Sequence, residues 1–364
     1  MKMRKFGDRL TGLIPSLISV VIGIVLGWLI LYLTNPKDAF AGIGTVLAGG
    51  FNEGAAGIGS VLYTATPIIL TGLSVGFGMK TGLFNIGASG QFTAGAFTAI
   101  AVGVKCTFLP AGLHVAAAIL CGFLAGALWG VIAGLLKAYC KVSEVISGIM
   151  LNYTAMLIVN LLIKSFLYDE KYNRSLPVAS SALISKNTFD FLLPGSNISL
   201  IFFGALIVAA VIKILLDKTA FGYELKTTGR NPFAVEAAGV DTKRSCVLTL
   251  AIAGAVAGLG GALMFLCDFG DHIPVSDTIL QQGFTGISVA LLGLSSPFGI
   301  VLAGLFIAYI TVGGNYLQLF SYTPDVVDMI IAVIIFCGAL VVPIRLLIKK
   351  ITDKRRHNEG EGWV

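Results

Sequence analysis

Two stretches of the chain combine residue types that could do chemical work. The first is Phe84-Asn-Ile-Gly-Ala-Ser-Gly-Gln91, which sets an aromatic ring among small residues and two side-chain amides. A flat heterocycle could stack on Phe84 and exchange hydrogen bonds with Asn85 and Gln91. Glycine-rich helices also approach closely or open onto a cavity. The segment therefore predicts contact with a small polar solute.

Further amides in apolar surroundings extend this candidate pathway. The residues assigned to it are Phe84, Asn85, Ser89, Gln91, Asn152, Gln281 and Gln282. The alternative is that these amides join helices to one another, where each hydrogen bond contributes about 0.6–2 kcal/mol in lipid. Residue types alone leave both interpretations open.

The second stretch is a short helix that we predict between Asn231 and Gly239. Asn231 suits an N-cap, Pro232 the first helical position and Gly239 the left-handed residue after the end. Gly222 and Gly229 are expected to allow turns before it. A short rigid helix on the cytoplasmic face can transmit movement from a soluble, energy-supplying protein to the membrane helices. The alternative is an ordinary amphipathic helix at the membrane interface.

Signatures of nucleotide or metal binding are absent from the sequence. It contains no Gly-Lys-Ser/Thr triplet and no H-E-x-x-H, its six cysteines form no C-x-x-C, and its three histidines are scattered. We therefore expect no metal site and no catalytic residue. Few charges lie deep in an apolar run, where each costs about 2.5–3.5 kcal/mol. The energy for any transport is thus expected to come from another chain.

The elements that must carry these residues are membrane helices. Of the 364 residues, 56% are hydrophobic and 12% are charged, and the mean hydropathy is +0.90. A soluble domain has about 25% charged residues. The apolar runs are continuous and reach the roughly 20 residues that a bilayer core requires, so helices are expected rather than a barrel. The composition predicts an all-α polytopic membrane protein with a single domain over residues 1–364.

Ten transmembrane helices fit the hydropathy pattern. They are predicted at about 14–33, 61–79, 85–104, 112–136, 145–167, 197–216, 246–267, 279–295, 298–318 and 325–347. The first apolar run is too long for a signal peptide and is interpreted as an uncleaved span. Ten spans place both termini on the same side of the membrane. When the connections are assigned to sides accordingly, 19 of the 25 basic residues fall on the side of the termini. The positive-inside rule then predicts cytoplasmic N- and C-termini.

Two connections are longer than a helix turn requires. Residues 168–196, outside, could touch an external partner, and residues 217–245, inside, form the predicted coupling loop. The net charge of +6 needs no nucleic-acid partner, because juxtamembrane lysines facing the anionic bilayer account for it.

The inside connection carries a family resemblance. From Thr219 to Val240 the pattern T-x-x-G-x-x-L-K-x-x-G-x-N-P-x-A-x-x-x-A-G-V resembles the coupling loop of permeases of branched-chain amino acid, ribose and nucleoside ABC importers. Residues 72–91 are similar to the GLFNIG-x-x-GQ segment of the simple-sugar and nucleoside branch, with Ser89 where that branch most often has glutamate. Glu236-Ala-Ala238 reads like the EAA signature of other importers, but its glycine follows at once, so that class is not assigned.

The resemblance implies a type II-like ABC importer permease in the bacterial cell membrane. Two permease subunits, often different, would form the pathway. A cytoplasmic ABC ATPase would use ATP and Mg, and an extracytoplasmic solute-binding protein, commonly a lipoprotein, would deliver the solute. Carried over by position, the residues in contact with the ATPase are Gly229, Arg230, Asn231, Pro232, Phe233, Glu236, Ala237, Ala238 and Gly239.

The expected function is therefore that of a transporter subunit without its own ATPase site, most simply for nucleosides. A permease for a simple sugar such as ribose is the alternative within the family. A self-powered secondary carrier and a membrane-embedded enzyme are the alternatives from other classes.

Overall fold

The computed structural model describes residues 18–19, 21–185, 198–268, 270–320, 322–340, 343–344 and 346–347. It divides into two compact units, one of residues 50–309 and one of residues 1–49 with 310–364. The first predicted span, at 14–33, begins before the continuously described chain, and the last, at 325–347, includes positions outside the described residues.

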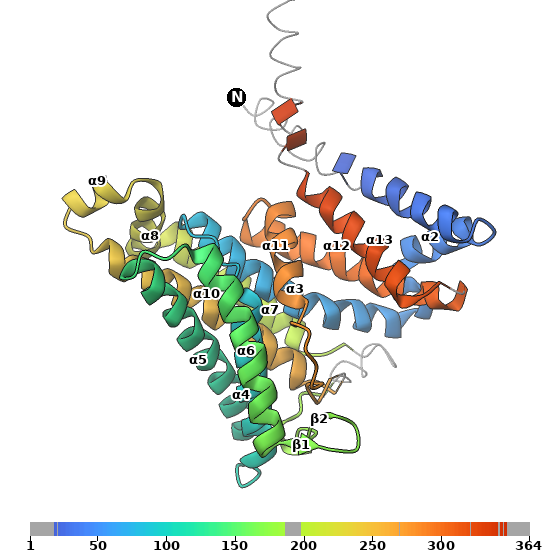
Figure 1. Cartoon of the computed structure of the whole chain (residues 1–364), viewed down its shortest axis with the longest axis horizontal. Coiled ribbons are helices and arrows are strands. Elements are labelled where there is room, and N and C mark those ends of the chain that lie inside the picture. The colour runs from blue at the N-terminus through green and yellow to red at the C-terminus, as the bar shows by residue number, and fades with distance from the viewer. Residues whose placement is uncertain are drawn as a thin grey trace, which may run out of the picture. The chain divides into compact units, whose positions relative to one another are not determined.

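The unit 50–309 is almost entirely helical (Figure 1). Its elements in chain order are η1 (Gly49–Glu53), α3 (Ala55–Lys80), α4 (Ala88–Lys105), α5 (Ala111–Ala138), α6 (Glu144–Phe166), β1 (Tyr168–Asp169), β2 (Arg174–Ser175), η2 (Ser180–Ala182), α7 (Ile201–Lys218), α8 (Ala220–Arg230), α9 (Pro232–Ala237), α10 (Thr242–Phe265), α11 (Gln282–Leu292) and α12 (Pro297–Asn315). The last helix continues into the other unit.

Five helical segments among the described residues are long and apolar enough to cross a membrane. They are Ala55–Lys80, Ala111–Ala138, Glu144–Phe166, Thr242–Phe265 and Pro297–Phe320. Such helices satisfy their backbone hydrogen bonds internally, which lipid requires. These segments are 23 to 28 residues long. These segments make the chain a mostly helical protein suited to a bilayer.

The helix in the predicted span 279–295 is shorter than the pattern suggested. α11 has 11 residues and rises about 16 Å, roughly half a hydrocarbon core. It ends at Gly293, and Leu294 and Ser295 follow with φ values of 54° and 53°. Two consecutive residues in the left-handed region cannot continue an α-helix, so α11 ends before them and α12 begins at Pro297.

Close backbone contacts hold the centre of this unit together. α5 has glycine at every fourth position, at Gly122, Gly126, Gly130 and Gly134. A Cβ on Gly126 would overlap the carbonyl of Gly254, and a Cβ on Gly130 would overlap the carbonyl of Leu250. Glycines one turn apart thus allow the backbones of α5 and α10 to touch, as in small-residue packing of membrane helices.

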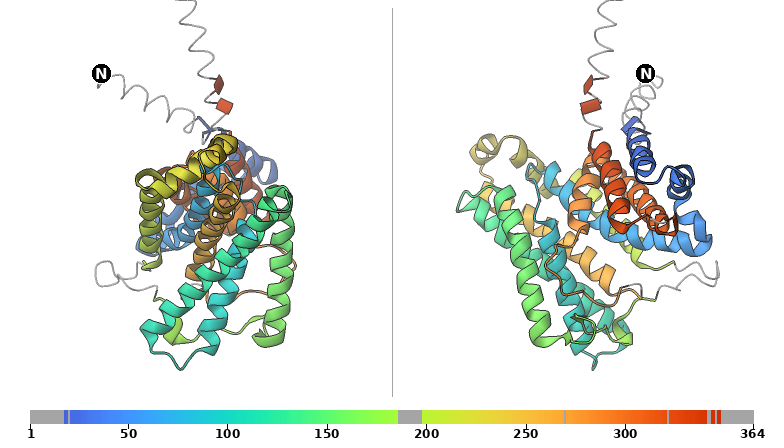
Figure 2. Two further views of the ribbon diagram at one scale, coloured as in Figure 1. Left: turned by 90° about the vertical axis from the view of Figure 1, so that its left-hand side faces the viewer. Right: turned by 45° about the vertical axis from the view of Figure 1, so that its right-hand side comes forward.

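The two ends of the unit differ in what they present. Figure 2 shows α8 and α9 at one end of the helices α4, α5, α6 and α10, and the hairpin of β1 and β2 at the opposite end. The hairpin is antiparallel and pairs Tyr168 with Ser175.

The described part of the unit of residues 1–49 and 310–364 is also helical, and it includes the end of α12 together with four named elements. They are the apolar helix Val21–Thr34, α2 (Ala39–Ala48), η3 (Tyr316–Phe320) and α13 (Pro324–Ala339). The hydroxyl of Tyr322 donates to the carbonyl of Asn35 at 3.1 Å, and the Asn35 amide donates to Asp38 at 2.7 Å. The bond from Tyr322 connects the ends of helices that lie far apart in the sequence, whereas the bond to Asp38 stays within the turn before α2. α2 lies in a segment that no predicted span covers.

Candidate functional site

The predicted short helix at 231–239 is present as α9. The side-chain oxygen of Asn231 accepts a hydrogen bond from the backbone N–H of Ala234 at 3.1 Å, as an N-cap does. Gly239 has a φ of 87°, the left-handed conformation expected after a helix end. The rules for helix ends therefore predicted this element correctly.

Turns were expected at Gly222 and Gly229, before α9. This expectation is wrong, because both glycines lie within the helix α8. The hydroxyl of Thr219 caps α8 by accepting from the N–H of Gly222 at 3.0 Å. A Cβ on Gly222 would overlap the carbonyl of Leu215, and a Cβ on Gly229 would overlap the carbonyl of Thr81. These glycines serve close packing, at a cost of about 1 kcal/mol each in helix propensity.

The residues predicted to contact an ATPase all lie at the surface of the α8–α9 end. All nine are exposed, and α9 has no buried residue. The side chain of Phe233 is 82% exposed, although a phenyl ring in water forgoes the gain from burial. An exposed aromatic on a rigid, capped helix is suited to insertion into a pocket of a partner protein.

The amides of the first candidate segment are buried and hydrogen-bonded to each other. Asn85 donates to the side-chain oxygen of Gln91 at 2.7 Å and to the hydroxyl of Ser74 at 2.9 Å, and Gln91 donates back to Asn85 at 3.0 Å. The Ser74 hydroxyl donates to the carbonyl of Ala253 at 2.6 Å. This network joins α3, α4 and α10 with the turn that precedes α4.

Ser74 also lies in the sequence Gly72-Leu-Ser-Val-Gly76, which has the Gly-x-Ser-x-Gly pattern of a hydrolase nucleophile. That pattern indicates a nucleophile only on a sharp strand-to-helix turn. Here Ser74 is in the interior of α3, is fully buried and donates its hydroxyl proton to a backbone carbonyl. We therefore assign it a structural role.

Asn152, on α6, makes contacts of the same helix-joining kind. Its side-chain oxygen accepts from the backbone N–H of Gly90 at 2.7 Å, and its nitrogen donates to the carbonyl of Ile86 at 3.0 Å. Of the two interpretations of the buried amides, the contacts of Asn85, Gln91 and Asn152 are those of residues that join helices.

Ser89 and Gln282 differ from these amides. The Ser89 hydroxyl and the Gln282 side-chain oxygen are both buried without a hydrogen-bond partner. The two residues belong to neighbouring elements, because a Cβ on Gly283 would overlap the backbone and hydroxyl of Ser89. A buried polar atom without a partner costs about 1–3 kcal/mol, so such atoms call for a water molecule or ligand.

The two remaining candidates lie in different surroundings. Phe84 is half-buried and packs against a small apolar cluster that includes Val75, Ala257 and Ala290. Gln281 is exposed and precedes the first residue of α11. The structure therefore brings Ser89 and Gln282 together next to the buried amides, whereas Gln281 faces outward.

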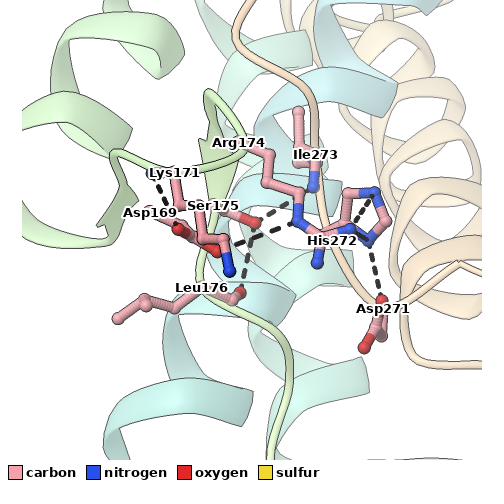
Figure 3. Close-up of polar contacts among 8 residues, drawn as sticks. All are labelled: Asp169, Lys171, Arg174, Ser175, Leu176, Asp271, His272 and Ile273. Carbon is pink, nitrogen blue, oxygen red and sulfur yellow. Dashed lines mark hydrogen bonds and ion pairs between the residues drawn. The ribbon is translucent and has the colours of Figure 1, made fainter.

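The opposite end of the unit is a compact cluster of polar contacts (Figure 3). Arg174 on β2 contacts the ring of His272 at 3.1 Å and lies 3.9 Å from Asp169, while His272 contacts Asp271 at 2.7 Å. Arg174 also lies over the ring of Tyr172, 4.7 Å from its centroid. The hairpin is thereby tied to the segment that follows α10.

Backbone bonds reinforce this connection. The N–H of Ser175 donates to the carbonyl of Ile273 at 2.9 Å, and the N–H of Ile273 donates to the Ser175 hydroxyl at 3.0 Å. The N–H of Val178 donates to the carbonyl of Asp271 at 3.1 Å. Sequence reasoning missed this cluster because about a hundred residues separate its two halves.

Within the described part of the chain, no group of three or more His, Cys, Asp or Glu side chains could hold a metal ion.

Comparison with known proteins identifies the family. Residues 57–339 match the family described as "Branched-chain amino acid transport system / permease component". The chain belongs to this permease family. It is a multi-pass membrane permease of bacterial ABC importers and not the catalytic subunit, since ABC systems hydrolyse ATP on a separate ATPase.

Two relatives of this permease match it over nearly its full length. It is 34% identical to the guanosine ABC transporter permease protein NupP of Bacillus subtilis over 347 residues, covering 95% of this chain and 98% of the relative. It is 33% identical to the nucleoside ABC transporter permease protein NupB of Lactococcus lactis, with 93% of each chain covered. The glucose ABC transporter permease protein TsgB13 of Haloferax volcanii is 32% identical over 77% of this chain and 75% of its own. No solved structure matches the permease.

Proposed function

We propose that this permease carries nucleosides into the cell. The observation that supports this substrate is the near full-length similarity to permeases named for guanosine and nucleosides, whereas the relative named for glucose is covered over about three quarters of its length. In this proposal the chain has ten spans and cytoplasmic termini, and its pathway contains Phe84, Ser89 and Gln282.

The chemistry of these three side chains suits a nucleoside. The ring of Phe84 offers a face on which a base can stack. The unpartnered oxygen of Gln282 accepts from an amino group or a ribose hydroxyl, and the Ser89 hydroxyl donates or accepts. Asn85, Gln91 and Asn152 hold the surrounding helices, and Gln281 lies at the exposed margin.

The two ends of the unit suit two different partners. The α8–α9 end, within the predicted coupling loop 217–245, presents the exposed Phe233 to a cytoplasmic ABC ATPase. The hairpin end, in the predicted external connection, faces a solute-binding lipoprotein. A second, different permease subunit completes the pathway in this proposal.

The test is uptake by the complete importer in proteoliposomes. ATP-dependent accumulation of radiolabelled guanosine is expected, with unlabelled adenosine competing and unlabelled ribose and glucose failing to compete. Competition by ribose or glucose alone would favour the simple-sugar alternative. Accumulation by this chain alone, driven by an ion gradient, would contradict the importer assignment and favour a secondary carrier.

A further inference from the structure

A direct backbone contact connects α8 to the turn before α4. Gly82 lies in this turn with a φ of 80°, and Gly229 lies in the last turn of α8. A Cβ on Gly82 would overlap the Cα of Gly229, and a Cβ on Gly229 would overlap the carbonyl of Thr81. No side chain separates the two segments, so a displacement of α8 is passed to the turn with little loss.

The chain on each side of this contact reaches either α9 or the buried polar network within three residues. After Gly229 the chain reaches Pro232, the first residue of α9. After Gly82 it reaches Asn85, which is hydrogen-bonded to Ser74 and Gln91. A short physical route therefore runs from the exposed helix α9 to the buried polar network.

Polar contacts hold the middle of α8 to α7 and α10. Lys226 lies 3.5 Å from Asp217 at the end of α7, and the hydroxyl of Ser245 on α10 donates to Glu224 at 3.2 Å. Rigid elements with such fixed contacts are the kind of structure that carries coupling between distant sites.

A cavity of about 280 Å³ lies beside the glycine contact. Its lining includes Lys137, Leu225, Pro232, Lys243 and Cys246, together with Gly82 and Gly229. The side of α8 and α9 that faces α5 and α10 is therefore not closely packed at this point.

We propose that the contact between Gly82 and Gly229 is the joint through which movement of α9 reaches the polar network at Asn85. Both glycines are positioning residues for transport rather than solute-binding residues. The proposal rests on the proposed role of α9 in contacting the ATPase.

The variant Gly82→Ala tests this joint in the complete reconstituted importer. Gly82 is not among the residues predicted to contact the ATPase, and the added methyl group meets the backbone of Gly229. We expect the ATPase to co-purify and to hydrolyse ATP while nucleoside uptake falls about ten-fold or more, as a lost coupling energy implies. The matched control is Gly54→Ala, because Gly54 also has a positive φ, of 60°, and a Cβ there meets nothing within 4 Å.

The outcomes separate this proposal from the proposed function. A Gly82→Ala importer that transports as fast as the Gly54→Ala control overturns the joint while leaving the permease function intact. Absence of ATP-dependent uptake by the unsubstituted importer counts against the proposed function itself.

A measurement without substitutions guards against a variant that fails to assemble. The thiol of Cys246 lines the cavity, so its rate of modification by a maleimide reports on the position of α8 and α9. Peptide mass spectrometry compares nucleotide-free importer with vanadate-trapped importer, with Cys106, beyond the far end of α4, as the internal reference. We expect the rate at Cys246 to change several-fold between states relative to Cys106. Equal relative rates overturn the proposal whatever the variant does.

Discussion

Asn152 on α6 caps the first turn of α4 from outside that helix. Its side-chain oxygen accepts from the N–H of Gly90 at 2.7 Å, and its nitrogen donates to the carbonyl of Ile86 at 3.0 Å. Gly87, the N-cap residue of α4, has no side chain with which to satisfy these N–H groups. A single amide thus secures both the start of α4 and the turn that precedes it.

Replacing Asn152 by leucine should destabilise the permease. The Gly90 N–H and the Ile86 carbonyl lose their partners in a buried site, at a cost of about 1–3 kcal/mol. Thermal unfolding of the detergent-solubilised protein should therefore shift downward by several degrees. Asn160→Leu, on the same helix, breaks one bond to the carbonyl of Ser276 and should have a smaller effect. Equal shifts for the two variants would contradict the capping role.

Removing the cap of α9 should weaken binding of the ATPase. Asn231→Ala eliminates the bond to the N–H of Ala234 and should cost about 1 kcal/mol of helix stability. The affinity of the ATPase for the permease, measured by titration in detergent, should fall about five-fold. Asn231→Asp retains an accepting oxygen and serves as the control. Loss of affinity in both variants would indicate that Asn231 contacts the partner directly rather than through its cap.

The exposed ring of Phe233 should be a dominant contact for the ATPase. If it fills a pocket of the partner, Phe233→Ala should weaken the complex by about 2 kcal/mol or more, as aromatic anchors at interfaces do. Phe108→Ala is a close control, since that ring is 81% exposed against 82% for Phe233 and lies between α4 and α5. Pull-down of the ATPase by the two variants in equal yield would rule out this anchor.

Ser89→Ala should impair transport without impairing the fold. Its hydroxyl has no protein partner, so its removal leaves no buried group unsatisfied and should not lower thermal stability. If the hydroxyl bonds the solute, the concentration for half-maximal uptake should rise about ten-fold, which corresponds to about 1.4 kcal/mol.

Ser74→Ala provides the contrast for Ser89→Ala. It removes a hydroxyl that bonds both Asn85 and Ala253, so stability should fall in that variant. Unchanged uptake kinetics in Ser89→Ala would remove this residue from the pathway.

The ends of the helices were predictable where local chemistry decides them. Asn231, Pro232 and Gly239 predicted α9 because caps and first positions depend on a few neighbouring residues. Long apolar runs similarly predicted α5 and α10 to within a few residues. The lipid environment imposes helix on such runs regardless of their contacts.

Contacts between distant residues were not predictable from local patterns. Gly222 and Gly229 suggested turns because glycine is flexible in isolation, whereas in the fold their missing side chains admit the backbones of Leu215 and Thr81. The sequence drew attention to Asn85 and Gln91, but it did not indicate that they bond each other. It also gave no sign that Ser74 links them to the carbonyl of Ala253, which is 179 residues further along the chain than Ser74.

The glycines along α5 set a limit on how this permease can change shape. Because its main chain touches that of α10 over several turns, the two cannot slide past each other by small steps without collision. We expect α5 and α10 to move together as one rigid body. Any change in shape of the permease then has to occur where this pair meets other helices. α11 lies outside this pair and packs against α3 and α4, where a Cβ on Gly286 would overlap Thr71 and a Cβ on Gly283 would overlap Ser89.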